Sequence, residues 1–215
     1  MKRTFACIMV LALILLSSCS QTKTESRALT AQEIETANEA FETMLPAHEG
    51  EVVSATDSEG DWILNPISHF FTSYYETPEQ LDMGKFVYYI PRESFVGAED
   101  KDELEKLKET GAWLPFDDIQ DSPVPFGRIP FSTVEQYLQT YMNVSLKDMT
   151  NMGDALYLED YETFYSYASD FGPGTFYCTR GDIRGDTVTL YGEDAKLTLQ
   201  KDGTKYFITS HLPIE

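Results

Sequence analysis

The sequence predicts an α+β fold in which helices pack on one face of a C-terminal four-strand antiparallel meander. Helix-capping patterns recur in the first two thirds of the chain, each followed by apolar residues at helical spacing. After about residue 175 the pattern changes to alternation of apolar and polar residues, which is typical of half-buried strands. Hydrophobic residues make up 42% of the chain, which is enough to form a core.

Three Ser/Thr-x-x-Glu/Gln patterns mark the expected helix starts. They begin at Thr30, Thr77 and Ser132, and the second carries Pro78 at the first helical position. A further short charged segment is expected to be a helix that Gly111 ends. The expected helices are 31–44, which Pro46 ends, 77–89, 102–110, and one that starts with the pattern at Ser132.

The segments between these helices are assigned from composition. Residues 46–61 are polar and contain glycine, and residues 113–130 contain four prolines, so both are expected to be loops. Ser68 to Tyr75 is rich in aromatic and hydroxylated residues, which favours a strand. Residues 155–168 are rich in tyrosine and fit a helix or a strand.

The C-terminal alternation predicts four strands spaced about ten residues apart. Asp202-Gly203 is a hairpin signal between the last two. One face of the sheet is apolar, so we expect the helices to cover it. The fold is also compatible with an NTF2-like or cystatin-like roll, an analogy that carries no function. The strands begin near Phe176, Thr187, Lys196 and Lys205, and the inward residues are Val188, Leu190, Leu197, Leu199 and Ile208.

The N-terminus has the three parts of an export signal. Lys2 and Arg3 supply positive charge, and Phe5 to Leu16 is an apolar run of 12 residues. A spanning helix needs about 20 residues, so this run predicts a signal peptide and not a stable anchor. Leu16-Ser17-Ser18-Cys19 follows and resembles the lipobox of bacterial lipoproteins. The resemblance implies cleavage before Cys19 and diacylglycerol on its thiol; the alternative is an ordinary secretory signal.

Three regions follow from this interpretation. Residues 1–18 are the signal peptide, 19–29 are the lipidated cysteine with a polar tether, and 30–215 form a single extracytoplasmic α+β domain. Two or more acyl chains on Cys19 hold a protein stably at a membrane. We therefore expect a protein on the extracytoplasmic face of the cell membrane, with the membrane as its partner through the lipid.

The charge of the chain excludes some partners. Its formal net charge is −20, and removal of Lys2 and Arg3 leaves 14 basic against 36 acidic residues, or −22. Such a surface repels nucleic acid and anionic lipid head groups. A protein of the cell envelope remains as an expected partner.

Little in the sequence indicates catalysis or metal binding. With Cys7 removed and Cys19 lipidated, Cys178 has no disulfide partner, and zinc-ligand spacing is absent. We expect no cofactor and no structural metal. Two alternatives remain open: a Cys178–His211 nucleophile pair, and a weak calcium site in the acidic runs 57–61 or 117–121.

Three stretches resemble a family of uncharacterised lipoproteins from Gram-positive bacteria. They are Asn65–Ser68 with Phe70–Tyr75, Tyr157–Tyr161, and Ser169–Gly174. The resemblance covers most of residues 30–211. It implies export and a single domain, and it carries no activity, ligand or catalytic residue.

The function that the sequence favours is a non-enzymatic, membrane-tethered binding or protein-interaction module of the cell envelope. The alternatives are an envelope hydrolase and a small-ligand carrier. Tyrosine is favoured in recognition surfaces, and it is concentrated before the Gly-Pro-Gly turn at 172–174. The competing interpretation is that these rings pack the seam between helices and sheet. The candidate surface is Tyr161, Tyr165, Tyr167, Asp170 and Phe171.

Overall fold

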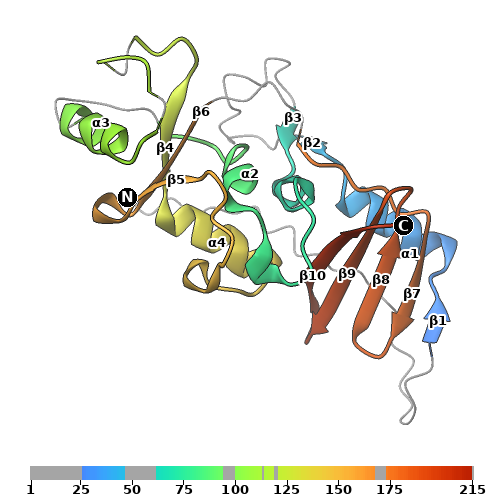
Figure 1. The fold of residues 1–215 in the computed structure, drawn as a ribbon. Coiled ribbons are helices and arrows are strands. Elements are labelled where there is room, and N and C mark those ends of the chain that lie inside the picture. Colours follow the sequence, from blue (N-terminus) through green and yellow to red (C-terminus); the bar gives the residue numbers. More distant parts are fainter. Residues whose placement is uncertain are drawn as a thin grey trace, which may run out of the picture.

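The structure is a computed structural model that describes residues 26–46, 62–93, 100–112, 114–118, 121–167 and 173–214. It contains helices together with a five-stranded antiparallel sheet, a three-stranded sheet and a two-stranded sheet (Figure 1). The predicted α+β class is confirmed. The likeness to an NTF2-like or cystatin-like roll stays a prediction.

The C-terminal sheet has the strand order β1-β7-β8-β9-β10. Its last four strands form the expected antiparallel meander, with the expected turn at Gly203 (φ +61°). Two details differ: the first meander strand begins at Arg180 and not at Phe176, and a fifth strand, β1, pairs with β7 inside the segment expected to be a tether. The strands are β1 (Ser26–Ala28), β7 (Arg180–Arg184), β8 (Thr187–Tyr191), β9 (Ala195–Asp202) and β10 (Lys205–Pro213).

One face of this sheet forms the core, as predicted. All five residues expected to point inward are at most 2% exposed. Helix α1 (Ala31–Ala40) crosses behind this face (Figure 1) and packs through Ala37 and the following Phe41. Arg27 of β1 reaches the same side and pairs with Glu33 of α1 at 2.6 Å. The inner face therefore belongs to the helix-sheet core.

The start of α1 is the predicted capping box. Thr30 accepts from the Glu33 amide, and the Glu33 carboxylate accepts from the Thr30 amide at 2.8 Å. The hydrogen bond from Arg27 is the main reason that the pKa of Glu33 falls to about 2. The helix ends at Ala40 and not at residue 44, because the chain turns into β2 (Met44–Pro46), which pairs with β3 (Trp62–Leu64).

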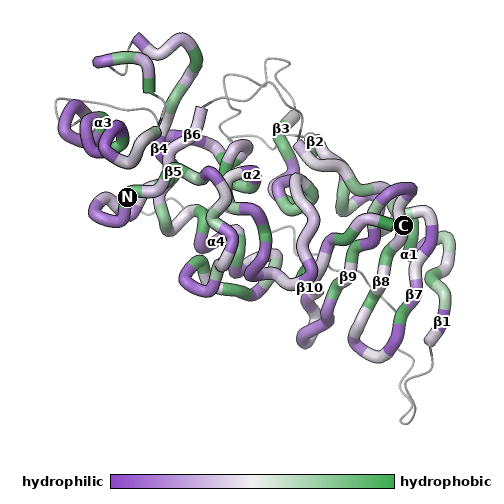
Figure 2. Tube along the Cα trace, viewed as in Figure 1, coloured by the Kyte–Doolittle hydropathy of each residue, from purple (hydrophilic) through white to green (hydrophobic). Residues whose placement is uncertain are grey.

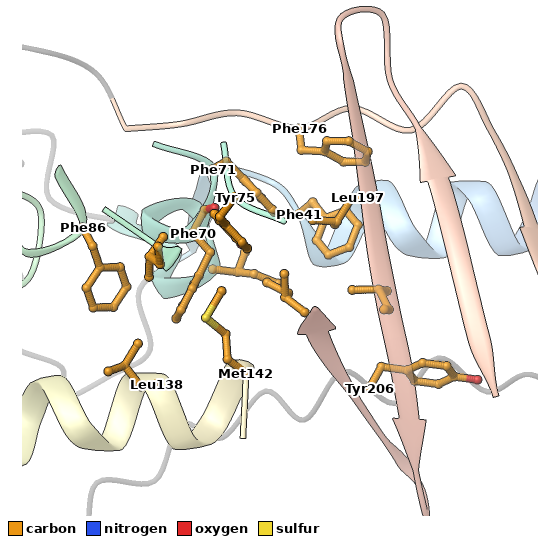
Figure 3. Packing of buried hydrophobic residues seen from close by; sticks show 14 of the residues in the cluster. Phe41, Phe70, Phe71, Tyr75, Phe86, Leu138, Met142, Phe176, Leu197 and Tyr206 are labelled. Atoms are coloured by element: carbon orange, nitrogen blue, oxygen red, sulfur yellow. The ribbon is translucent and has the colours of Figure 1, made fainter. Parts of the chain in front are cut away.

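The strand predicted over Ser68–Tyr75 is wrong. This segment begins with the 3-10 helix η1 (Pro66–Phe71). The Asn65 side chain accepts from the Ile67 amide at 3.3 Å, and Pro66 at the first position starts the turn. Phe70 and Phe71 point into the core between α4 and the sheet (Figure 3). Phe70 and Phe71 of this aromatic segment are therefore buried side chains of a 3-10 helix, whereas Tyr74 is 53% exposed.

The helix predicted over 77–89 is split into two. The Thr77 capping box forms, but on the 3-10 helix η2 (Pro78–Gln80). Leu81 then takes an extended conformation, with ψ 131°. Asp82 caps a second helix, α2 (Met83–Val87), by accepting from the Lys85 amide at 3.2 Å.

The middle of the chain forms the end of the molecule farthest from β1 (Figure 1). Its elements are α3 (Asp100–Glu109), β4 (Phe126–Pro130), α4 (Phe131–Tyr141), η4 (Leu146–Asp148), β5 (Leu156–Leu158), η5 (Glu159–Tyr161) and β6 (Thr163–Tyr167). The three strands have the order β4-β6-β5. The expected helix before Gly111 is α3, which is largely hydrophilic in Figure 2.

Two predictions in this region are wrong. The proline-rich segment 113–130 was expected to be a loop throughout, yet its last five residues are β4, which ends at Pro130. The third capping box does not form: α4 begins at Phe131, and its cap position is Pro130. The Glu135 carboxylate instead accepts from the Leu146 amide at 2.6 Å, so it fixes the next turn of the chain.

The buried apolar residues form two clusters. The larger joins the inner face of the five-stranded sheet to α1, η1, α2 and α4, as the rings in Figure 3 show. The smaller lies between α3 and the β4-β6-β5 sheet. Its buried members are Leu104, Leu107, Leu114, Phe116, Phe126, Leu158 and Tyr165.

Candidate functional site

The residues of the predicted tyrosine surface differ in their exposure to solvent. Tyr165 on β6 is 1% exposed and is part of the smaller cluster. It therefore packs the core, as the competing interpretation stated, and cannot contact a partner. Tyr161 and Tyr167 are partly exposed, whereas Asp170 and Phe171 lie outside the described residues.

Tyr165 belongs to a buried polar cluster. Its hydroxyl donates to the carboxylate of Glu103, a residue that is only 2% exposed. The Arg128 guanidinium donates to the same carboxylate, with its Nε at 2.8 Å. Burial, with the nearby carboxylate, holds the pKa of Tyr165 well above its ordinary value. This cluster attaches α3 to β4 and β6, and the side chains of Glu103 and Tyr165 are buried within it.

A second arginine fixes the neighbouring strand edge. One Nη of Arg92 donates to the Tyr88 and Tyr167 carbonyls and to the Ser166 hydroxyl, at 2.9 to 3.1 Å. The next residue, Glu93, pairs through its backbone with Arg128. A Cβ at Gly127 would lie 2.7 Å from the Glu93 carbonyl oxygen, so glycine permits this close approach. The Arg92 contacts are therefore structural.

What remains of the tyrosine surface is small. Tyr161 lies under the ammonium of Lys106, 5.0 Å from the ring centroid, and Lys106 pairs with Asp160 at 2.8 Å. Tyr167 packs against Phe126, with 4.7 Å between the ring centroids. The pair Tyr161 and Tyr167 is therefore the described part of the candidate partner surface.

The structure does not assemble Cys178 and His211 as a nucleophile and its base. The Cys178 thiol donates to the Arg180 carbonyl at 3.2 Å, and burial raises its pKa. His211 donates from Nδ1 to the Ser73 carbonyl at 2.7 Å, while burial lowers its pKa. The Cys178 backbone is held by Asn38 of α1. Both side chains are thus bound to backbone carbonyls instead of to each other.

The acidic runs give no metal centre within the described residues. The run 57–61 lies outside them, and in the run 117–121 Asp117 pairs with Lys108 at 2.8 Å. Across the described ranges, no group of three or more His, Cys, Asp or Glu side chains is placed to hold a metal ion. The weak calcium site stays a prediction for the first run.

The outer face of the five-stranded sheet is a surface that sequence reasoning did not single out. Within the described residues, no helix covers it in Figure 1. One row across four strands consists of Arg180, Tyr191, Lys196 and Leu212, with the Arg180 guanidinium 3.7 Å from the centre of the Tyr191 ring. The next row holds Asp182, Thr189, Thr198 and Ser210, and the third holds Arg184, Thr187, Gln200 and Phe207. The polar half of the strand alternation was the signal for this face.

The net charge of this outer face is opposite in sign to the net charge of the whole chain. Arg180, Arg184 and Lys196 are basic, and Asp182 is the acidic residue in the same three rows. The face is therefore net positive on a chain whose formal charge is −20. Such a local reversal attracts anionic surfaces at short range.

Comparisons with known proteins add no relative: no family model, no curated protein and no solved structure matches this chain. Among the residues that the structure describes, no helix is long and apolar enough to cross a membrane.

Proposed function

We propose that this protein is a lipid-anchored lipoprotein of the extracytoplasmic membrane face whose folded domain binds a protein of the cell envelope. The observation that carries the proposal is the order of segments at the N-terminus. Lys2 and Arg3, the 12-residue apolar run and Leu16-Ser17-Ser18-Cys19 stand in the order that export and lipidation require.

The start of the described domain supports a short anchor. Ser26 already pairs with Arg184 in the sheet, seven residues after Cys19. Seven residues span at most about 24 Å, at roughly 3.4 Å each. A domain on such a tether stays near the membrane surface, so it reaches partners that are themselves in or beside the membrane.

Binding accounts for the described side chains better than catalysis. The two groups that could have formed a thiol enzyme are bound to backbone carbonyls. Tyr161 and Tyr167 instead leave aromatic area partly open at the end of the molecule opposite β1. Tyrosines of this kind supply contact area at low entropic cost.

The anchor is tested with Cys19→Ala, compared with Cys178→Ala as the matched cysteine control. We expect Cys19→Ala to leave an uncleaved precursor that incorporates no labelled fatty acid. The control should be processed, labelled and recovered in the membrane fraction. Normal lipid labelling of Cys19→Ala would refute the anchor.

The binding surface is tested by crosslinking in intact cells. Tyr161→Ala combined with Tyr167→Ala should abolish a crosslinked species that the unmodified chain forms. Tyr177→Ala, which removes a ring that is 69% exposed elsewhere, is the control and should leave that species intact. Equal crosslinking in all three chains would exclude the tyrosine surface.

A further inference from the structure

The outer face of the five-stranded sheet is bordered by β1, the strand at which the described chain begins. The sheet begins with β1, and the described chain enters it at Ser26, beside Arg184. Ser26 is the seventh residue after Cys19, and it pairs with Arg184, so the chain can place the row containing Arg184 no farther than about 24 Å from the cysteine. Strand β7 then leads from Arg184 back to Arg180, a distance of only about 13 Å.

The outer face has the composition of a contact surface. The Arg180 guanidinium lies over the Tyr191 ring, and Lys196 is the cross-strand neighbour of Tyr191 on β9. The third row ends in Phe207, and the first ends in Leu212. The basic groups are spread over both ends of β7 and onto β9, so a flat anionic surface can meet all of them together.

The charge of the rest of the molecule adds to this preference. The chain as a whole is strongly acidic, so an anionic bilayer repels most of its surface. A protein held beside an anionic bilayer turns its least acidic face toward that bilayer, because this face is repelled least. At about 0.1 M salt, the electrostatic field of the bilayer extends only about 10 Å from its surface. The charged residues within that distance therefore decide which face of the protein is turned toward the bilayer.

We propose that the outer face of the five-stranded sheet, through Arg180, Arg184 and Lys196, binds the anionic head groups of the membrane that holds the anchor. This proposal rests on the proposed lipidation of Cys19. It refines the expectation from net charge alone, under which anionic head groups would repel the protein throughout. It makes the anchor and the sheet two contacts with one membrane.

The test measures how fast an amine-reactive reagent modifies individual lysines of the mature chain. The chain is coupled through Cys19 to a maleimide lipid in vesicles of phosphatidylcholine alone or with phosphatidylglycerol, and mass spectrometry gives each rate. Coupling in vitro makes the result independent of processing in cells. Failure of lipidation in the Cys19→Ala experiment and failure of membrane contact are thus separate outcomes.

We expect Lys196 to react roughly fivefold more slowly on the anionic vesicles, the bias that one basic residue near such a surface produces. High salt should restore the rate. The exposed lysines Lys85, Lys101 and Lys147 lie on other elements and should react equally on both vesicles. Equal rates for Lys196 on both vesicles would overturn the proposal.

Two double variants distinguish an effect of the outer face from an effect of the net charge of the protein. Arg180→Gln with Arg184→Gln should remove the protection of Lys196, whereas Lys85→Gln with Lys147→Gln changes the net charge equally and should preserve it. Loss of protection in both pairs would show a general charge effect and would also overturn the proposal. Far-UV circular dichroism of each variant confirms that the sheet is intact.

Discussion

Replacing Arg128 with methionine tests whether the buried Glu103 cluster stabilises the smaller core. The Glu103 carboxylate is 2% exposed and accepts hydrogen bonds from Arg128 and Tyr165. Methionine keeps most of the aliphatic stem and removes the cation, so the carboxylate stays buried without its charge partner. Breaking a buried pair in this way costs about 3–5 kcal/mol. Because 22% of the Arg128 side chain is exposed, we expect the lower end, about 3 kcal/mol.

The matched variant Glu103→Gln removes the charge from the other side. Glutamine keeps the volume and can still accept from Tyr165, and the partly exposed guanidinium can be hydrated. We therefore expect a smaller loss, about 1–2 kcal/mol. The double variant should lose less free energy of unfolding than the sum of the two single variants, since it leaves neither charge buried without its partner.

Urea unfolding followed by circular dichroism measures these differences. For a chain of this size, a loss of about 3 kcal/mol corresponds to a melting temperature roughly 6–12 °C lower. If Arg128→Met loses no more free energy of unfolding than Glu103→Gln, the carboxylate is hydrated in the folded protein and the argument fails.

Three further predictions concern the larger core. Leu199→Ala should lower the free energy of unfolding by about 2–5 kcal/mol in a urea titration, because its side chain is 1% exposed, and an unchanged midpoint would contradict its inward position. Cys178 should react with a thiol reagent far more slowly in native protein than in urea, since it is buried with a raised pKa; equal rates would contradict this. Burial lowers the pKa of His69 to about 3 and also lowers that of His211, so below pH 6.5 the unfolded chain binds more protons. Urea titrations should therefore show stability falling between pH 6.5 and pH 4.5, less steeply in His69→Phe, and a pH-independent midpoint would refute the assignment.

The C-terminal sheet could be predicted because its pattern is local. Apolar residues at every second position define a buried face wherever the partner strands lie. Val188, Leu190 and Leu199 are therefore placed correctly without knowledge of the topology. The strand β1 could not be found in this way, because its three residues are exposed and pair with a strand more than 150 residues later.

The errors in the middle of the chain come from hydrogen bonds between side chains and the backbone. Glu135 stands at the right spacing for a capping box, yet its carboxylate satisfies the Leu146 amide instead. The aromatic run after Asn65 has strand-like composition, but the Asn65 side chain and Pro66 start a turn first. Local propensity is decided there by side-chain-to-backbone hydrogen bonds, which composition does not encode.

The candidate site was only partly predictable for a similar reason. The density of tyrosines indicated a candidate surface, but the sequence could not separate the buried Tyr165 from its partly exposed neighbours. That separation depends on Glu103, whose carboxylate is 62 residues away along the chain. A buried acidic residue in a charged helix gives no signal in a hydropathy pattern.

Strand β1 joins the start of the described chain to the sheet and to α1. Its three residues pair with β7, and Arg27 joins it to Glu33 at the start of α1. The Leu29 amide then donates to the Gly181 carbonyl at 2.8 Å, so the attachment continues into the helix cap. If Cys19 is lipidated as proposed, a force on it would act on an edge strand that is hydrogen-bonded to the sheet and ion-paired to α1. Under the proposed lipidation of Cys19, the charges of the outer face would act together with the tether to set the orientation of the sheet at the membrane.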